Sequence, residues 1–345
     1  MSTEPGSPLP RAARATVGEI SEAFLIDRIR SRLPPPPPWL AVGVGDDAAV
    51  IERERNRLDV VTTDVVVEGV HFDRRYFPAP AIGFKALAVN LSDLAAMGAT
   101  PRWATLSLVL PPTLTLADFD GLLDGLLDLA GACRVSIVGG NIARSPGPLV
   151  IDVTASGTVR RRYVLKRDGA RPGDDLWVSG TVGAAAAGLG VCSSGPPAGK
   201  GFDACVERFL RPEPRVRLGT LVGRSRSARA CIDLSDGLSE GLKQLAAASG
   251  AGVTVEEASL PVSAESRAWF EKMGPDPVIS ALAGGEDYEL LFAVSARQRR
   301  AFLAAAALSK VPVTRIGTVT RGDACLLRRL DGSQLPLPGG FAHFA

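Results

Sequence analysis

The chain has 345 residues, enough for about two domains of ordinary size. Hydrophobic residues make up 46% and charged residues 22%, a balance that excludes a disordered or collagen-like chain. The net charge of +2 comes from 39 basic and 37 acidic side chains without a long basic block, so no nucleic-acid partner is implied. No stretch of ~18 apolar residues occurs, and the first residues hold no apolar signal segment, so we expect a cytoplasmic protein without a membrane anchor.

The predicted elements begin after a polar, proline- and arginine-rich segment, residues 1–16, which we expect to be a flexible tail. A helix follows, with apolar residues from Leu25 to Leu33 along one stripe, and it ends at the prolines of 34–38. We interpret this proline run as a rigid spacer, and a ligand for a proline-reading module is the alternative.

The rest of the chain alternates β-branched runs with helical patterns. Strands are expected at 40–44, 48–51, 58–63, 65–67, 103–110, 135–138, 149–159, 176–179, 252–255, 288–294 and 313–319. Helices are expected at 81–98, 116–132, 184–191, 215–222, 238–248 and 263–273. Alternation in both halves predicts an α/β or α+β protein. A basic, turn-rich stretch near 160–172 predicts an N-terminal domain at 17–160 and a C-terminal domain at 161–345.

Cysteine and histidine usage narrows the chemistry. The five cysteines are far apart and never form a C-x-x-C pair, which argues against a disulfide framework or a structural zinc site. Only two histidines occur, His71 and His343, so a histidine-rich metal site is not expected. The closest approach to a Walker loop, residues 195–201, has the wrong glycine spacing and lacks the required Ser or Thr, so we expect a flexible loop there.

Six short polar motifs lie at predicted strand ends or turns. They are GDD at 45–47, TTD at 62–64, NLSD at 90–93, GGN at 139–141, DLSDG at 233–237 and GGED at 284–287. A single motif of this kind is usually a surface turn or a helix cap, and Asp93 and Ser235 each fit the cap interpretation.

The apolar flanks of these motifs change the interpretation. VGVGDDAAVI, LDVVTTDVVV and ACIDLSDGL place acidic residues directly against buried-strand patterns, with few basic residues to pair with them. Carboxylate and hydroxyl oxygens are the ligands of hard cations, which indicates Mg²⁺. Together with glycine turns that let backbone amides approach phosphate oxygens, the pattern predicts an enzyme that uses Mg²⁺ and a nucleotide. It does not identify the substrate that accepts the phosphoryl group.

Taken together, the motifs resemble the thiamine-monophosphate kinase family of the aminoimidazole-ribonucleotide-synthetase-like superfamily. The matching stretches run from GEISEAFLI to GGFAHFA over most of 18–345, and the block 85–111 and GVHF are the most specific. The resemblance implies direct in-line transfer of the ATP γ-phosphoryl group to thiamine monophosphate, without a covalent catalytic nucleophile. It also implies a homodimer in which strands of an ATP- and Mg²⁺-binding N-terminal domain pair across the interface, with the active site in a cleft between the two domains.

The resemblance assigns residues as well. The implied Mg²⁺ ligands are Asp47, Thr62, Thr63, Asp64, Asp93, Asn141, Asp233 and Asp236. The implied ATP contacts are Gly140, Asn141, Arg167 and Ser235. The implied thiamine monophosphate contacts are His71, Glu286 and Phe341, with a packed histidine and a C-terminal docking aromatic as the alternatives for the first and last.

One position departs from the family pattern. Asn141 stands where the family typically has aspartate, and an amide offers an oxygen to Mg²⁺ but no negative charge. We therefore expect a working site with a higher Mg²⁺ requirement. The alternatives to a kinase are a non-catalytic protein that binds Mg-ATP or thiamine phosphates, and another ATP-using enzyme of the same superfamily.

Overall fold

The computed structural model describes residues 15–194 and 201–341, and the chain forms two compact units. The first unit comprises 15–53, 63–87 and 103–154, and the second comprises 54–62, 88–102, 155–194 and 201–341. The expected tail and the 195–201 loop lie almost entirely outside the described residues.

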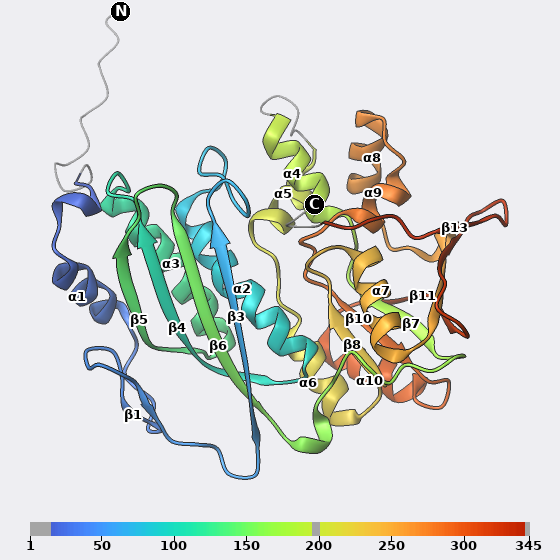
Figure 1. The fold of residues 1–345 in the computed structure, drawn as a ribbon, viewed down its shortest axis with the longest axis horizontal. Coiled ribbons are helices and arrows are strands. Elements are labelled where there is room, and N and C mark those ends of the chain that lie inside the picture. Colours follow the sequence, from blue (N-terminus) through green and yellow to red (C-terminus); the bar gives the residue numbers. More distant parts are fainter. Residues whose placement is uncertain (1–14, 195–200, 342–345) are drawn as a thin grey trace, which may run out of the picture. The chain divides into compact units, whose positions relative to one another are not determined.

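A four-stranded sheet, in the order β3-β6-β4-β5, carries the TTD motif on β3 and the GGN motif on β5 (Figure 1). Its strands are β3 (Leu58–Val67), β4 (Thr100–Leu110), β5 (Ser136–Arg144) and β6 (Val150–Val159). Strands β4 and β5 run parallel, with Ser107 opposite Asn141. A separate two-stranded sheet pairs β1 (Leu40–Val42) with β2 (Val50–Ile51).

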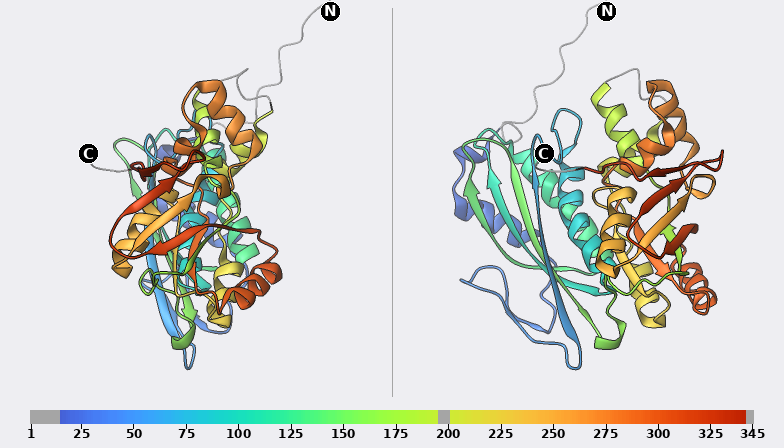
Figure 2. Two further views of the ribbon diagram at one scale, coloured as in Figure 1. Left: turned by 90° about the vertical axis from the view of Figure 1, so that its right-hand side faces the viewer. Right: turned by 45° about the vertical axis from the view of Figure 1, so that its right-hand side comes forward.

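Side chains alternate sharply across the four-stranded sheet. On β4, Ala104, Leu106 and Leu108 are buried, whereas Thr105 and Ser107 on the other face are half-buried. The helices on this part of the chain are α1 (Glu22–Arg32), α2 (Ala79–Ala96) and α3 (Leu116–Cys133). Figure 2 shows α2 and α3 along one face of the sheet, which leaves the polar face for a site.

The second unit is built on a seven-stranded sheet in the order β13-β12-β9-β11-β7-β10-β8. Its pairs are antiparallel except for β12 with β9. The strands are β7 (Asp175–Ser179), β8 (Ala230–Asp233), β9 (Gly252–Glu256), β10 (Leu290–Val294), β11 (Val313–Thr320), β12 (Cys325–Arg328) and β13 (Gln334–Pro336).

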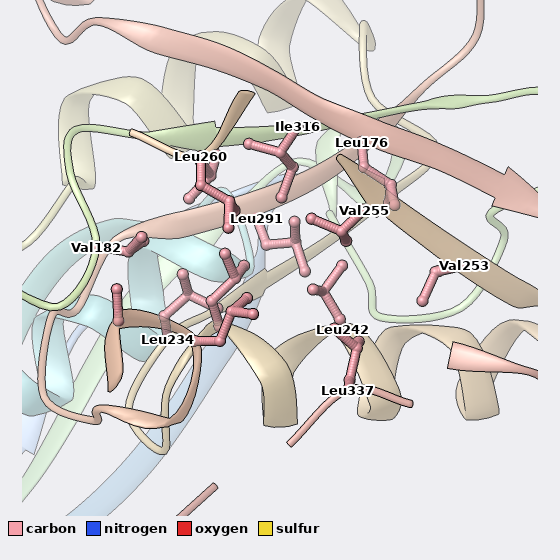
Figure 3. Close-up of a cluster of buried hydrophobic side chains, with 14 of the residues drawn as sticks. Leu176, Val182, Leu234, Leu242, Val253, Val255, Leu260, Leu291, Ile316 and Leu337 are labelled. Carbon is pink, nitrogen blue, oxygen red and sulfur yellow. The ribbon is translucent and has the colours of Figure 1, made fainter. Parts of the chain in front are cut away.

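Helices form a hydrophobic core on each face of that sheet. They are α4 (Ala184–Ser194), α5 (Asp203–Leu210), α6 (Val216–Ser225), α7 (Leu238–Ser249), α8 (Ala264–Met273), α9 (Pro277–Ala283) and α10 (Arg299–Ser309). Short 3₁₀ turns span Val17–Glu19, Arg161–Tyr163 and Glu257–Ser259. Leu176 of β7 packs into the core that includes Leu242 of α7, whereas its neighbour Trp177 packs into the core that includes Phe302 of α10. Figure 3 shows the first of these cores, with Leu234 of the DLSDG motif among its side chains.

The expectation of a mixed α/β fold is confirmed, with three kinds of difference. The runs expected at 58–63 and 65–67 form the single strand β3, because the alternation continues through Asp64. Three short helices (α5, α9, α10) and two short strands (β12, β13) were not expected, whereas β8 confirms the buried-strand pattern of ACIDLSDGL. VGVGDDAAVI is not a buried strand, since Asp46 and Asp47 are exposed in the connection between β1 and β2.

The described residues contain no helix that is both long and apolar enough to cross a membrane.

Candidate active site

Asp233 is the most deeply placed of the predicted ligands. It ends β8, an edge strand, and is followed by Leu234, which packs into the core shown in Figure 3. The side chain of Asp233 is buried, at 7% exposure. The DLSDG loop is therefore anchored by an apolar residue between two polar ones.

Two predicted ligands from elsewhere in the second unit meet Asp233. Burial, and then the negative charge of Asp93, raise the pKa of Asp233 to about 7. The Thr62 hydroxyl donates a hydrogen bond to the Asp93 carboxylate. The Ser92 hydroxyl donates to Oδ2 of Asp233 at 2.8 Å and opposes part of that shift. Thr62, Asp93 and Asp233 therefore form one oxygen-rich cluster.

The donor set of this cluster fits Mg²⁺. Its atoms are carboxylate and hydroxyl oxygens, and two like charges near each other at a buried position are what a bound cation would neutralise. Throughout the described ranges, however, no three His, Cys, Asp or Glu side chains gather in a metal-holding arrangement. The cluster thus supplies two carboxylates and a hydroxyl, and phosphate or water oxygens would have to complete a coordination shell.

Arg167 contributes positive charge to this cluster. It is exposed, and its Nη1 donates to Oε1 of Gln244 at 3.2 Å. Its charge acts to lower the pKa of Asp233, against the larger effects of burial and Asp93. A guanidinium in this position is suited to a phosphate.

Three predicted segments are joined by backbone hydrogen bonds around the DLSDG loop. The amide of Glu286 donates to the carbonyl of Ser235 at 2.6 Å, and the amide of Phe341 donates to the carbonyl of Asp236 at 3.3 Å. The amide of Tyr288 donates to the carbonyl of Leu234 at 2.9 Å. The predicted substrate residues Glu286 and Phe341 are thereby placed beside the predicted ligand Asp236.

In the first unit, the polar face of the sheet forms part of a cavity of about 860 Å³. Of the predicted site residues, Asp47, Gly140 and Asn141 line it. Asn141 lies opposite Ser107, which also lines the cavity, and both project from the face that carries polar side chains.

The TTD motif is divided between the two faces of β3. Thr62 and Asp64 are half-buried and alternate with Thr63, which is exposed. Successive strand side chains point to opposite faces, so the Thr63 hydroxyl lies away from that of Thr62. It is 3.0 Å from Oδ1 of Asp152 and 3.1 Å from Oγ1 of Thr154.

Asp152 and Thr154 were missed by the sequence reasoning, although both line the cavity. The signal was present in VIDVTASGTV, where Ile151, Val153 and Ala155 are buried and the alternating positions are polar. Period-two alternation in a strand marks a polar face. Thr105 was overlooked for the same reason, since it lies on the polar face of β4 and lines the cavity.

His71 belongs to a turn at the end of β3. Its Nδ1 accepts the Val67 amide at 3.1 Å, and its carbonyl accepts Nζ of Lys85 at 2.9 Å. Lys85 is 1% exposed and its ammonium lies 5.1 Å from the centre of the Phe77 ring. A buried lysine therefore holds the backbone of this turn, which orients the half-buried imidazole.

The chain is similar to known proteins over nearly its full length. Residues 45–159 match the family model "AIR synthase related protein, N-terminal domain", and 171–326 match the corresponding C-terminal domain. Thiamine-monophosphate kinase of Escherichia coli (strain K12) is 38% identical over 330 residues, covering 94% of this chain and 97% of its own. The crystal structure of thiamine-monophosphate kinase from Stenotrophomonas maltophilia K279a is 41% identical, with a TM-score of 0.79 over 91% of this chain and 97% of its own. The structure of AaThiL complexed with AMPPCP and TMP is 34% identical, with a TM-score of 0.75 over 94% of this chain and 98% of its own.

Proposed function

This chain belongs to the thiamine-monophosphate kinase family, and we propose that it transfers the γ-phosphoryl group of ATP to thiamine monophosphate, giving thiamine diphosphate and ADP. The observation that carries the proposal is the proximity of Asp93 to the buried Asp233, in a chain similar over nearly its full length to AaThiL, whose structure was solved as a complex with AMPPCP and TMP. AMPPCP is an analogue of ATP. The proposed reaction likewise brings a nucleoside triphosphate next to a phosphate monoester.

The chain's own residues would hold Mg²⁺ through Asp93, Asp233 and the Thr62 hydroxyl, with Asp47, Thr63, Asp64, Asn141 and Asp236 as the further ligands that the family resemblance implies. Bound Mg²⁺ would neutralise phosphate oxygens and stabilise the transferring phosphoryl group. Arg167 supplies a fixed positive charge toward ATP, and Gly140, Asn141 and Ser235 are the other proposed ATP contacts. No side chain needs to form a covalent intermediate in an in-line transfer.

Thiamine monophosphate carries a cationic thiazolium ring, and the second unit offers two groups suited to it. Phe341 is 52% exposed, and an aromatic ring is suited to stacking on a cationic ring. Glu286 supplies a negative charge suited to a cationic ring, and its backbone amide is bonded to the Ser235 carbonyl, next to Asp236. His71, held on its own turn in the first unit, is the third proposed contact.

We also propose that the protein is a cytoplasmic homodimer that pairs through β3. This strand is an edge of the four-stranded sheet, and Val61 and Val65 on its solvent side are 60% and 46% exposed. An edge strand with exposed apolar side chains is a template for pairing with another chain. Light scattering with size-exclusion chromatography tests this, and a monomer at micromolar concentration would overturn it.

The test of the activity is chromatographic detection of thiamine diphosphate after incubation of the purified protein with ATP, Mg²⁺ and thiamine monophosphate. We expect product that requires both ATP and Mg²⁺. Folded protein that binds thiamine monophosphate but forms no product over a wide Mg²⁺ range would instead identify a binding protein. Product from a different acceptor would identify another ATP-using enzyme of the superfamily.

A further inference from the structure

The segment that carries Glu286 has an unusual backbone. Glu286 has φ of 69° and Tyr288 has φ of 49°, so two non-glycine residues on either side of Asp287 adopt the left-handed conformation. Residues with a Cβ atom are disfavoured there, and such conformations persist only where surrounding contacts hold them. The contacts that hold this turn are therefore informative.

Asp287 is the side chain that ties the turn to the rest of the second unit. It is 1% exposed, and its carboxylate accepts the amide of Gly183 at 2.6 Å and the amide of Ala185 at 3.1 Å. These amides lie at the start of α4, where backbone N–H groups lack partners within the helix. One carboxylate thus satisfies two amides and links α4 to the turn.

The residues that follow Asp287 are held as firmly. Nη2 of Arg208 donates to the carbonyl of Asp287 at 2.9 Å and to Oε1 of Glu289 at 2.7 Å. Glu289 is fully buried and also accepts Nε of Arg215 at 2.7 Å and the Ser179 hydroxyl at 2.5 Å. The positively charged side chains match the buried carboxylate, so this network leaves the turn little freedom.

The clamped turn continues directly to the DLSDG loop, through the amides of Glu286 and Tyr288 on the carbonyls of Ser235 and Leu234. The DLSDG loop has an independent anchor, because Leu234 lies in the hydrophobic core. Glu286 follows Gly284 and Gly285 and directly precedes Asp287, whose carboxylate is bonded to the start of α4. The contacts of Asp287 therefore hold the backbone that carries Glu286.

We propose that Asp287 is a positioning residue for the acceptor substrate: by anchoring the left-handed turn to the start of α4, it orients Glu286 toward thiamine monophosphate. This inference rests on the proposed kinase function. It assigns Asp287 no contact with substrate or with the transferred phosphoryl group.

The test is steady-state kinetics of Asp287→Asn at pH 8. The amide is nearly isosteric but cannot accept hydrogen bonds from both backbone amides. We expect KM for thiamine monophosphate to rise about tenfold, as for loss of one charge-assisted hydrogen bond, while KM for ATP changes less than twofold. A merely structural role would reduce the fraction of folded enzyme, which lowers the maximal rate and leaves both KM values unchanged.

Asp174→Asn is the matched control. Asp174 is also a buried carboxylate, at 3% exposure, and accepts the Arg171 amide at 2.9 Å. Asp174 directly precedes β7. The other end of β7 pairs with the beginning of β10, which follows the clamped turn, so Asp174 lies at the end of β7 away from that turn. We expect Asp174→Asn to leave both KM values unchanged.

Arg208→Met provides a second variant if Asp287→Asn does not fold. Its side chain is partly exposed, and its loss removes the bond to the Asp287 carbonyl while Arg215 continues to neutralise Glu289. We expect about a threefold rise in KM for thiamine monophosphate.

The outcomes separate the two proposals. Wild-type turnover with an unchanged KM for thiamine monophosphate in the folded variants overturns this inference alone. Wild-type protein that forms no thiamine diphosphate overturns the proposed function, and the inference with it.

Discussion

The two units hold their candidate residues in contrasting ways. In the second unit, Asp233 and the turn around Asp287 are buried and joined to other segments by hydrogen bonds. In the first unit, Asp47 and Asn141 are exposed side chains that line an open cavity. The same polar residue types therefore affect the free energy of unfolding in the second unit and hardly affect it in the first. Substitutions should separate accordingly: we expect those of Asp233 and Asp287 to change the free energy of unfolding as well as activity, and those of Asp47 and Asn141 to change activity alone.

The largest expected effect is that of Asp93→Asn, which removes one of the two carboxylates of the buried cluster. We expect kcat/KM to fall about 1,000-fold, since loss of a metal ligand removes several kcal/mol of transition-state stabilisation. The metal-free variant should be no less stable than wild type in urea unfolding, because the repulsion between Asp93 and Asp233 is relieved. Asp128→Asn, at an exposed position on α3, is the control and should keep wild-type activity. A decrease of less than tenfold in Asp93→Asn would contradict the ligand assignment.

The next effect is a pH dependence of stability that originates in Asp287. Burial raises the pKa of its carboxyl group from 3.8 to about 7, despite the amides that donate to it. A raised carboxyl pKa means that the folded protein binds the proton more tightly, so the contribution is complete below pH 3.8 and is lost as pH rises through about 7. Between pH 5 and pH 8.5, wild type should lose about 3 kcal/mol of unfolding free energy relative to Asp287→Asn. Urea titrations at both pH values measure this, and parallel pH profiles of the two proteins would disprove it.

A smaller effect separates two adjacent glycines of the first unit. A Cβ atom at Gly140 would lie 2.1 Å from the carbonyl oxygen of Leu106, so the strands would have to move apart. A Cβ atom at Gly139 would meet only a Thr105 methyl group at 3.8 Å. We expect Gly140→Ala to lower the free energy of unfolding by about 2 kcal/mol and Gly139→Ala to change it by less than ~0.5 kcal/mol. Equal effects in denaturant unfolding would show that the sheet tolerates the extra atom.

The smallest expected effect concerns Asn141. Asn141→Asp adds a negative charge on the exposed wall of the cavity, so the Mg²⁺ concentration that gives half-maximal turnover should fall about fivefold, or ~1 kcal/mol in metal affinity. Stability should stay within ~0.5 kcal/mol of wild type, in contrast to the substitutions in the second unit. Asn141→Ser, which is also uncharged, serves as the comparison. An unchanged Mg²⁺ dependence in Asn141→Asp would remove Asn141 from the metal site.

The sequence predicted the fold class, most long elements and the motifs, because long periodic segments such as α3 carry their burial pattern openly. It did not predict α9, which spans only Pro277–Ala283. It also placed Asp47 against a buried strand, although the neighbouring strands are short and contain no buried residue. The hydrophobic pattern of a segment indicates its periodicity, but it does not show whether another element packs against that segment.

For the site as well, the sequence predicted the motif residues but not the contacts between segments that are far apart in the chain. The motifs named Asp233 and Glu286, but their connection depends on bonds between segments about fifty residues apart, such as that from the Glu286 amide to the Ser235 carbonyl. Asp287 is the last residue of the GGED motif, and only its burial against the start of α4 distinguishes it from an ordinary turn residue. Thr63 had appeared equivalent to Thr62 until strand alternation separated them.

Leu234 gives the hydrophobic core of the second unit a role in recognition. It is buried in that core while its two neighbours in sequence, Asp233 and Ser235, are proposed ligand-binding residues. A substitution in the core that shifted Leu234 by a few tenths of an ångström would shift both neighbours with it. Changes in core packing are therefore a route by which the proposed site would change during evolution without any change in the motif itself.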